Sequence, residues 1–118
     1  MATGMIKAPA GLFTESKGAI YQNRLAEGAT LIARRMTFPS NGKITVIYCV
    51  FKTVANLNAD AAIATGFPTG YASPVEVPGM RTSNNQFTNF YINSMGSLCT
   101  GQSIPANTWC QCSAVYLS

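Results

Sequence analysis

The most regular hydrophobic pattern in the chain lies in residues Lys43–Lys52, where eight apolar, aromatic or β-branched residues stand between two lysines. Successive side chains of a strand point to opposite faces of its sheet. One face would carry Ile44, Val46, Tyr48 and Val50, and the other Thr45, Ile47, Cys49 and Phe51. Because both sets suit burial, the pattern predicts an inner strand that is covered on both faces. A buried helix is the alternative, but the preceding Asn41-Gly42 turn signal favours a strand.

Similar segments separated by turn signals occur along most of the chain. The further strands that we expect are residues 19–25, 29–36, 61–65, 75–82, 86–93, 97–100 and 108–117. Residues 29–36 also fit a short helix, and Pro78-Gly79 predicts an edge strand or a bulge. Strands at intervals of roughly 8–12 residues indicate an antiparallel sandwich or barrel.

The last strand keeps its alternation almost to the end of the sequence. One predicted face holds Cys110, Cys112, Ala114 and Tyr116, and the other Trp109, Gln111, Ser113, Val115 and Leu117. A frayed tail would have no reason to be apolar, so we expect this strand inside the sheet. The length of 118 residues fits one domain. We therefore expect an N-terminal arm or linker over residues 1–17 and one β-sandwich domain over residues 18–118.

The composition argues against two classes of function, nucleic-acid binding and catalysis. Charged residues make up only 10% of the chain, with a net charge of +4. The adjacent bases Arg34 and Arg35 would point to opposite faces of a strand, so we expect no nucleic-acid site. Histidine is absent, and the four acids are far apart in the sequence. Without a general base or a paired carboxylate, we expect no enzyme activity.

The four cysteines form no recognised metal motif. Cys110 and Cys112 are two residues apart on one strand face, where a disulfide would break the strand. A zinc site would need Cys49 and Cys99 as well, at no known spacing. We therefore expect thiols that pack as small apolar side chains, with no metal and no cofactor. The sequence also lacks a signal-peptide pattern and an apolar run of membrane-spanning length, which predicts no membrane insertion.

Three stretches of the second half carry motifs in a familiar order. Residues 63–74, Ile-Ala-Thr-Gly-Phe-Pro-Thr-Gly-Tyr-Ala-Ser-Pro, resemble an "Ile-Ala-x-Leu-Pro-x-Gly-Tyr-x-Pro" turn. Residues 90–98 resemble an "x-Ile-x-x-x-Gly-x-Ile" hairpin, and residues 104–118 an "Ile-x-Ala-Gly-x-x-x-x-Ile-Ser-x-x-Tyr-Ile" terminal strand. Together they resemble the small C-terminal head domains of bacteriophage tail fibres and other receptor-binding tail or baseplate proteins, over about residues 41–118.

The resemblance implies an all-β, jelly-roll-like antiparallel sandwich that forms a homotrimer. It also implies attachment to a host-cell surface receptor, possibly a carbohydrate, rather than catalysis. Such a protein would be part of the virion and would be made in the host cytoplasm without a signal peptide. The low charge independently favours self-association. A free-standing lectin-like carbohydrate-binding module and an animal-virus fibre head are the alternatives.

Candidate ligand contacts follow from side-chain chemistry. Sugars are held by aromatic faces and by amides that both donate and accept hydrogen bonds. The candidates are Tyr71, Asn84, Asn85, Gln86 and Trp109, with Arg81 as a contact for an anionic group. The two aromatic residues could instead pack under a loop or in a trimer seam, and the two asparagines could simply form a turn.

Overall fold

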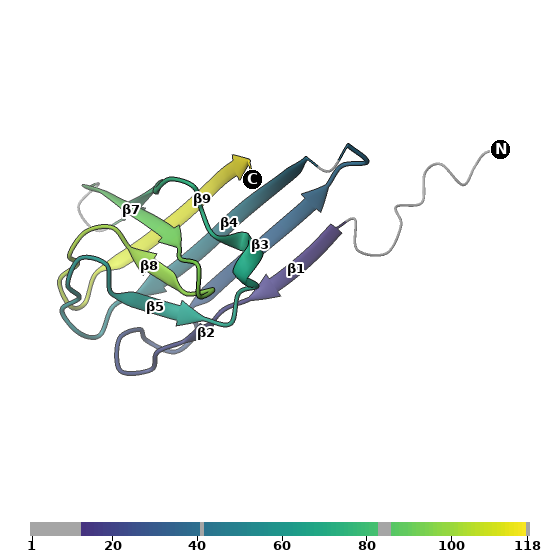
Figure 1. The fold of residues 1–118 in the computed structure, drawn as a ribbon. Helices are drawn as coiled ribbons and strands as arrows, with labels where there is room; N and C mark the ends of the chain where they lie inside the picture. Colours follow the sequence, from purple (N-terminus) through teal and green to yellow (C-terminus); the bar gives the residue numbers. More distant parts are fainter. Residues whose placement is uncertain (1–12, 41, 83–85, 118) are drawn as a thin grey trace.

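The computed structural model describes residues 13–40, 42–82 and 86–117, which form an antiparallel β-sandwich without an α-helix (Figure 1). The strands are β1 (Phe13–Lys17), β2 (Ala19–Ile20), β3 (Thr30–Thr37), β4 (Lys43–Lys52), β5 (Ala62–Thr65), β6 (Val77–Arg81), β7 (Gln86–Ile92), β8 (Leu98–Thr100) and β9 (Trp109–Leu117). They are hydrogen-bonded in the order β1-β3-β4-β9-β6-β7-β8-β5-β2. The predicted all-β sandwich is therefore confirmed.

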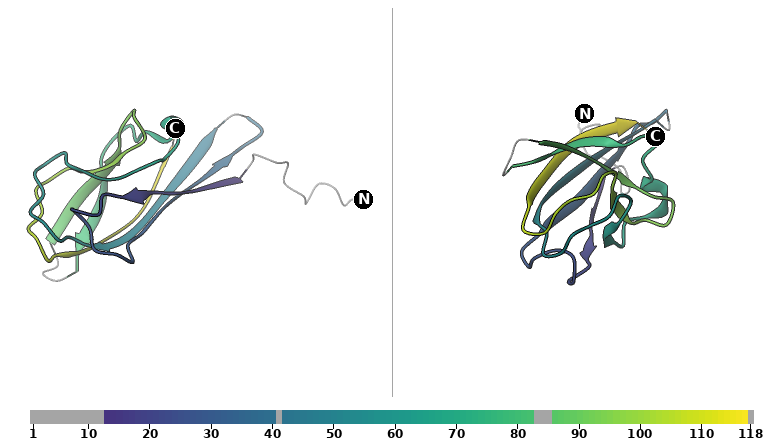
Figure 2. Two further views of the ribbon diagram at one scale, coloured as in Figure 1. Left: turned by 90° about the horizontal axis from the view of Figure 1, so that it is seen from below. Right: turned by 90° about the vertical axis from the view of Figure 1, so that its left-hand side faces the viewer.

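The sheet folds over on itself and nearly closes. The long strands β3, β4 and β9 form one layer, and the shorter β7, β8 and β5 curve across part of it (Figures 1 and 2). The two outermost strands, β1 and β2, are separated in the chain only by Gly18. A Cβ atom at Gly18 would lie 2.7 Å from the Phe67 ring, so a larger residue there would push the two layers apart.

The hydrophobic core fills the space between the layers. Its centre contains Phe51 of β4 and Phe90 of β7, whose rings meet edge to face with centroids 5.8 Å apart. Aromatic pairs favour this arrangement. Around them lie other fully buried apolar residues, including Leu25, Ile47, Ile63, Ile92, Leu98 and Ile104. One continuous core thus joins strands from both layers.

The central strand β4 has the predicted bounds, but it is not buried on both faces. Thr45, Ile47, Cys49 and Phe51 have no exposed surface and face the core. On the opposite face Tyr48 is 43% exposed, and its neighbours on that face are half-buried. The prediction of two-sided burial is therefore wrong for a single chain, because the second layer covers only one side of the long strands.

Strand β6 corrects the prediction for Pro78-Gly79. It lies between β7 and β9 and is neither an edge strand nor a bulge. Backbone pairing with β9 begins at Gly79, so the missing N–H group of Pro78 costs no ladder hydrogen bond there, and the Cys112 thiol of β9 donates a hydrogen bond to the Pro78 carbonyl oxygen. A Cβ atom at Gly79 would lie 2.3 Å from the Phe90 ring. Glycine thus allows the central phenylalanine to pack against the backbone of β6.

The N-terminal part of the sandwich also differs from expectation. Phe13–Lys17 form β1, which pairs with β3, so this part of the predicted arm belongs to the sheet. Residues 1–12 lie outside the described residues. The strand predicted over residues 19–25 is limited to Ala19–Ile20. The following residues turn, and Leu25 makes only an isolated bridge with Thr53.

Strand β9 confirms the prediction for the end of the chain. It lies between β4 and β6 and pairs with β4 along its whole length. Its residues alternate strictly between exposed and buried, and the buried set is Cys110, Cys112, Ala114 and Tyr116. The predicted opposite orientations of Arg34 and Arg35 are also confirmed, since Arg34 is exposed and Arg35 is buried.

Candidate functional site

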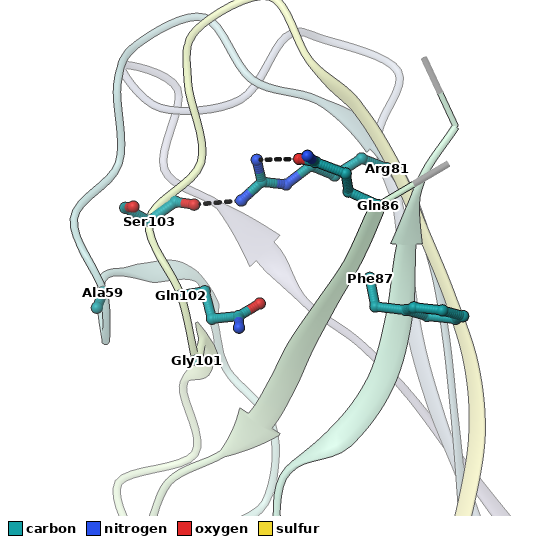
Figure 3. A pocket seen from close by; sticks show the side chains of 7 residues that line it. All are labelled: Ala59, Arg81, Gln86, Phe87, Gly101, Gln102 and Ser103. Carbon is teal, nitrogen blue, oxygen red and sulfur yellow. Dashed lines mark hydrogen bonds between the residues drawn. The ribbon is translucent and has the colours of Figure 1, made fainter. Parts of the chain in front are cut away.

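An open hollow of about 790 Å³ lies at the end of the sandwich where β4 ends and β9 begins. Its walls come from the loop after β4, the end of β6, the start of β7 and the segment after β8 (Figure 3). The lining residues are Ala59, Arg81, Gln86, Phe87, Gly101, Gln102 and Ser103. We call this the loop-end hollow.

Arg81 holds three walls of the loop-end hollow together. Its Nε donates a hydrogen bond of 2.8 Å to Oγ1 of the fully buried Thr88. One terminal nitrogen, Nη1, donates to the Gln86 side-chain oxygen at 3.3 Å, and the other, Nη2, donates to the Ser103 carbonyl oxygen (Figure 3). The planar guanidinium thus links β6, β7 and the loop after β8. Arg81 therefore shapes the hollow besides giving it a positive charge.

The lining offers polar groups that suit a hydroxyl-rich ligand. Gln86, Gln102 and Ser103 are exposed, and their amide and hydroxyl groups both donate and accept hydrogen bonds. The Phe87 side chain is 70% exposed at the rim, and Figure 3 shows its ring directed away from Gln102. None of these lining residues carries a carboxylate or a thiol.

Two of the predicted ligand residues, Arg81 and Gln86, meet in the loop-end hollow. Trp109 is 49% exposed but does not line it; its side chain lies on the outer face of β9, opposite the buried Cys110. Asn84 and Asn85 lie outside the described residues. Two of the six candidates chosen from the sequence therefore line this hollow.

Tyr71 occupies a different place from the one predicted for a ligand contact. It belongs to the short turn η2 (Thr69–Tyr71) and is only 4% exposed. The guanidinium of Arg35 lies 4.3 Å from the centre of its ring, and the Tyr116 hydroxyl donates a hydrogen bond to its carbonyl oxygen. The Thr14 hydroxyl bonds to its hydroxyl. Tyr71 therefore packs under its loop, and its position does not support a ligand role.

Among the lining residues that the sequence did not single out are Phe87, Gln102 and Ser103. Gln102 and Ser103 follow β8 and reach the hollow because the β7–β8 hairpin returns the chain to the start of β7. Their local sequence resembles any polar turn. Phe87 is an apolar residue in an alternating strand, so its sequence context also fits a core residue. Only the structure shows that it lies on the outward face of β7.

A second, smaller hollow of about 310 Å³ has acidic walls. It contains Asp60 and Glu76, and the Tyr91 hydroxyl donates a 2.8 Å hydrogen bond to the Asp60 carboxylate. This bond raises the pKa of Tyr91 above its usual value, because losing the proton would break it. The lining of this hollow carries two carboxylates and no positive charge, so it would repel an acidic ligand group.

The four cysteines are buried free thiols. Cys49 of β4 lies directly across from Cys112 of β9. The hydrogen bond between these thiols and their burial raise the pKa of Cys49 well above its usual value. The same hydrogen bond lowers the pKa of Cys112. All four thiols are buried, which agrees with their predicted role as small core residues.

We expect metal chelation to leave the protein unchanged. Within residues 13–40, 42–82 and 86–117, no three His, Cys, Asp or Glu side chains gather into a metal site. Because no bound ion would then contribute to folding, the melting temperature should be the same with and without EDTA. A fall of several degrees on chelation, reversed by added zinc or calcium, would contradict this prediction.

None of the residues that the structure describes forms a helix of the length and apolar character that a membrane span requires.

Comparison with known proteins reveals a similarity in structure but none in sequence. No protein-family model and no curated protein sequence matches the chain. The chain is similar in structure to the receptor binding protein (gp15) of Listeria phage PSA, with a TM-score of 0.66 and 15% sequence identity. The match covers 90% of this chain and 65% of that chain, so this chain spans less than two thirds of the length of the phage protein. At this identity the similarity establishes a shared fold.

Proposed function

We propose that this chain is a receptor-binding domain of a phage virion and attaches the particle to the surface of its host cell. The observation that carries the proposal is the fold, which over most of the chain is similar to that of a phage receptor binding protein. The motifs in residues 63–74, 90–98 and 104–118 support the same class independently, because they resemble those of phage fibre heads.

The position of the loop-end hollow suits contact with a receptor. The cross-strand register places the start of β1 and the end of β9 in one row, which runs through Met36 and Ile44. This row lies at the end of the sandwich away from the hollow (Figure 1). Any segment that joins either terminal strand to a particle would therefore leave from that end, and the hollow would face outward.

We assign the receptor group to the glycan class. The exposed amides of Gln86 and Gln102 and the Ser103 hydroxyl match the hydroxyls of a sugar, and Arg81 adds a positive charge for an acidic substituent. Binding without catalysis is the proposed activity. The assembly is proposed to be a homotrimer, which would present three equivalent hollows and strengthen attachment through multivalency.

Replacing Gln102 by alanine should weaken attachment. One lost hydrogen bond contributes roughly 0.5–1.5 kcal/mol, which corresponds to roughly a two- to tenfold loss of affinity. The measurement is binding of the purified, labelled protein to a panel of bacterial cells and to an array of bacterial glycans. Gln22→Ala is the matched control, since Gln22 is an exposed glutamine outside the hollow.

Treatment of the cells distinguishes the kinds of receptor. Periodate destroys sugar diols and should abolish binding, whereas protease treatment of the cells should leave it intact. Loss of binding after protease alone would replace the glycan by a protein receptor. No binding to any cell or glycan would overturn the attachment function, and an equal effect of Gln22→Ala and Gln102→Ala would move the site away from the hollow.

A further inference from the structure

The side of β3, β4 and β9 that faces away from the core is unusually apolar. We call this side the outer face. It consists of Thr30, Ile32, Arg34, Met36, Ile44, Val46, Tyr48, Val50, Lys52, Trp109, Gln111, Ser113, Val115 and Leu117. Arg34 and Lys52 are the charged residues in this set: Arg34 is paired with Glu15 of β1 at 2.7 Å, and Lys52 lies at the end of β4, across from Trp109. Large apolar surfaces of this kind mark interaction sites.

The outer face contains both a hollow and protruding side chains. Arg34, Met36, Ile44 and Val46 line a mainly apolar hollow of about 210 Å³. Beside it on β9, Val115 is 62% exposed and Leu117 is 71% exposed. They are the cross-strand partners of Val46 and Ile44, so they border the hollow directly. The face therefore carries an apolar cavity and apolar side chains of a size to fill one.

We infer that copies of this chain meet through the outer face, and that Val115 and Leu117 of one copy enter the hollow of the next. This inference rests on the proposed homotrimer and identifies the surface that forms it. In a ring of three copies each contact joins the protruding residues of one copy to the hollow of the next, which is a heterologous contact, and such contacts close into a ring when the rotation between copies allows it. A ring of three copies is the simplest outcome that fits the proposed function.

The outer face supplies a substantial part of the area that such contacts need. Ten residues of β4 at about 3.3 Å each extend about 33 Å, and three strand widths of about 4.8 Å add up to about 14 Å. The projected area is then about 460 Å², more than half of the roughly 800 Å² per partner of a stable interface. Side-chain relief and neighbouring strands add to it. The shortage of charge also matches the buried centre of interfaces, whereas a glycan would need more polar partners.

The test is a charge placed on the protruding residues. Val115→Lys should raise the concentration at which the assembly dissociates by roughly a hundredfold or more, because an unpaired charge would be buried at each contact. Lysine is chosen because the residues that line the receiving hollow include no carboxylate that could pair with it. Val75→Lys is the matched control, since Val75 is 65% exposed and lies outside the outer face. Mass is measured by light scattering across a dilution series, and folding by circular dichroism.

The outcomes separate this inference from the proposed attachment function. The outer-face contact is supported if the wild type and Val75→Lys are trimeric while Val115→Lys is folded but dissociated. If Val115→Lys does not fold, Leu117→Lys takes its place in the same comparison. Persistent trimers of a folded variant would overturn the outer-face contact, and a monomeric wild type would overturn it and leave the face to a different protein. If the trimer mass is as expected but the protein binds no cells, the attachment function is contradicted and the outer-face contact is not.

Discussion

Ile47→Asp should leave no folded protein, whereas Val46→Asp should fold. The two residues are neighbours in β4 but face opposite sides of the sheet. Ile47 has no exposed surface, so the carboxylate would be buried without a partner. The loss of apolar burial, about 1.5–3 kcal/mol, and a desolvation cost of several kcal/mol would together rival the 5–15 kcal/mol of a typical domain.

Val46 is only half-buried, and it lies on the outer face directly across from Arg34. A carboxylate there would remain hydrated and would face an opposite charge on the neighbouring strand. The expected cost is about 1 kcal/mol, mainly from the lower strand preference of aspartate. Soluble yield and thermal melting of dilute samples provide the measurement. A folded Ile47→Asp protein, or an unfolded Val46→Asp protein, would mean that the two faces of β4 are assigned the wrong way round.

The two faces of β4 show what the hydrophobic pattern could and could not predict. The long apolar run was enough to predict the bounds of the strand, because eight such residues between two lysines, after a turn signal, fit few structures other than a strand. Which face is covered by the same chain was not predictable. Ile44, Val46, Tyr48 and Val50 suit a core, an interface between copies or an unusual surface equally well, and only the course of the second layer decides.

Short elements were predicted poorly for a related reason. β2 contains only Ala19–Ile20, since it exists through pairing with β5. Immediately after it the chain turns, and the N–H groups of Arg24 and Leu25 both bond to the Tyr21 carbonyl. Nothing in the local pattern distinguishes this turn from a longer strand. The length of β2 is set by the tertiary structure.

The candidate site was predictable only in part. Arg81 and Gln86 were chosen for their chemistry, and they meet because β6 and β7 pair directly, with the two residues opposite each other. Gln102 reaches them through the return of the chain after β8, which requires the topology. Tyr71 has the composition of a ligand contact, but the buried Arg35 beneath it holds it in the core. Side-chain chemistry suggested the class of ligand, and the fold selected the residues.

Truncation after Ala114 should unfold the protein, although only one of the described residues that it removes is buried. Tyr116 is 6% exposed, and its hydroxyl donates a hydrogen bond to the Tyr71 carbonyl oxygen. Loss of a buried aromatic side chain costs about 3–5 kcal/mol. The same deletion removes the pairing of β9 with residues 44–46 of β4, which exposes backbone groups of the central strand. The sum rivals the stability of a typical domain.

Two milder variants separate these contributions. Tyr116→Phe keeps the ring and the strand but leaves the Tyr71 carbonyl oxygen without this donor, at about 1–3 kcal/mol. It should fold with a lowered melting temperature. Leu117→Ser removes an exposed side chain and should hardly change the stability of the separated single chain, since that side chain is 71% exposed. Thermal melting and soluble yield of the three proteins should therefore rank Leu117→Ser above Tyr116→Phe, with the truncated chain unfolded. A soluble truncated protein with a cooperative melt would show that the fold does not depend on the end of β9. The contacts of Tyr116 with the loop around Tyr71 would then contribute less than their burial indicates.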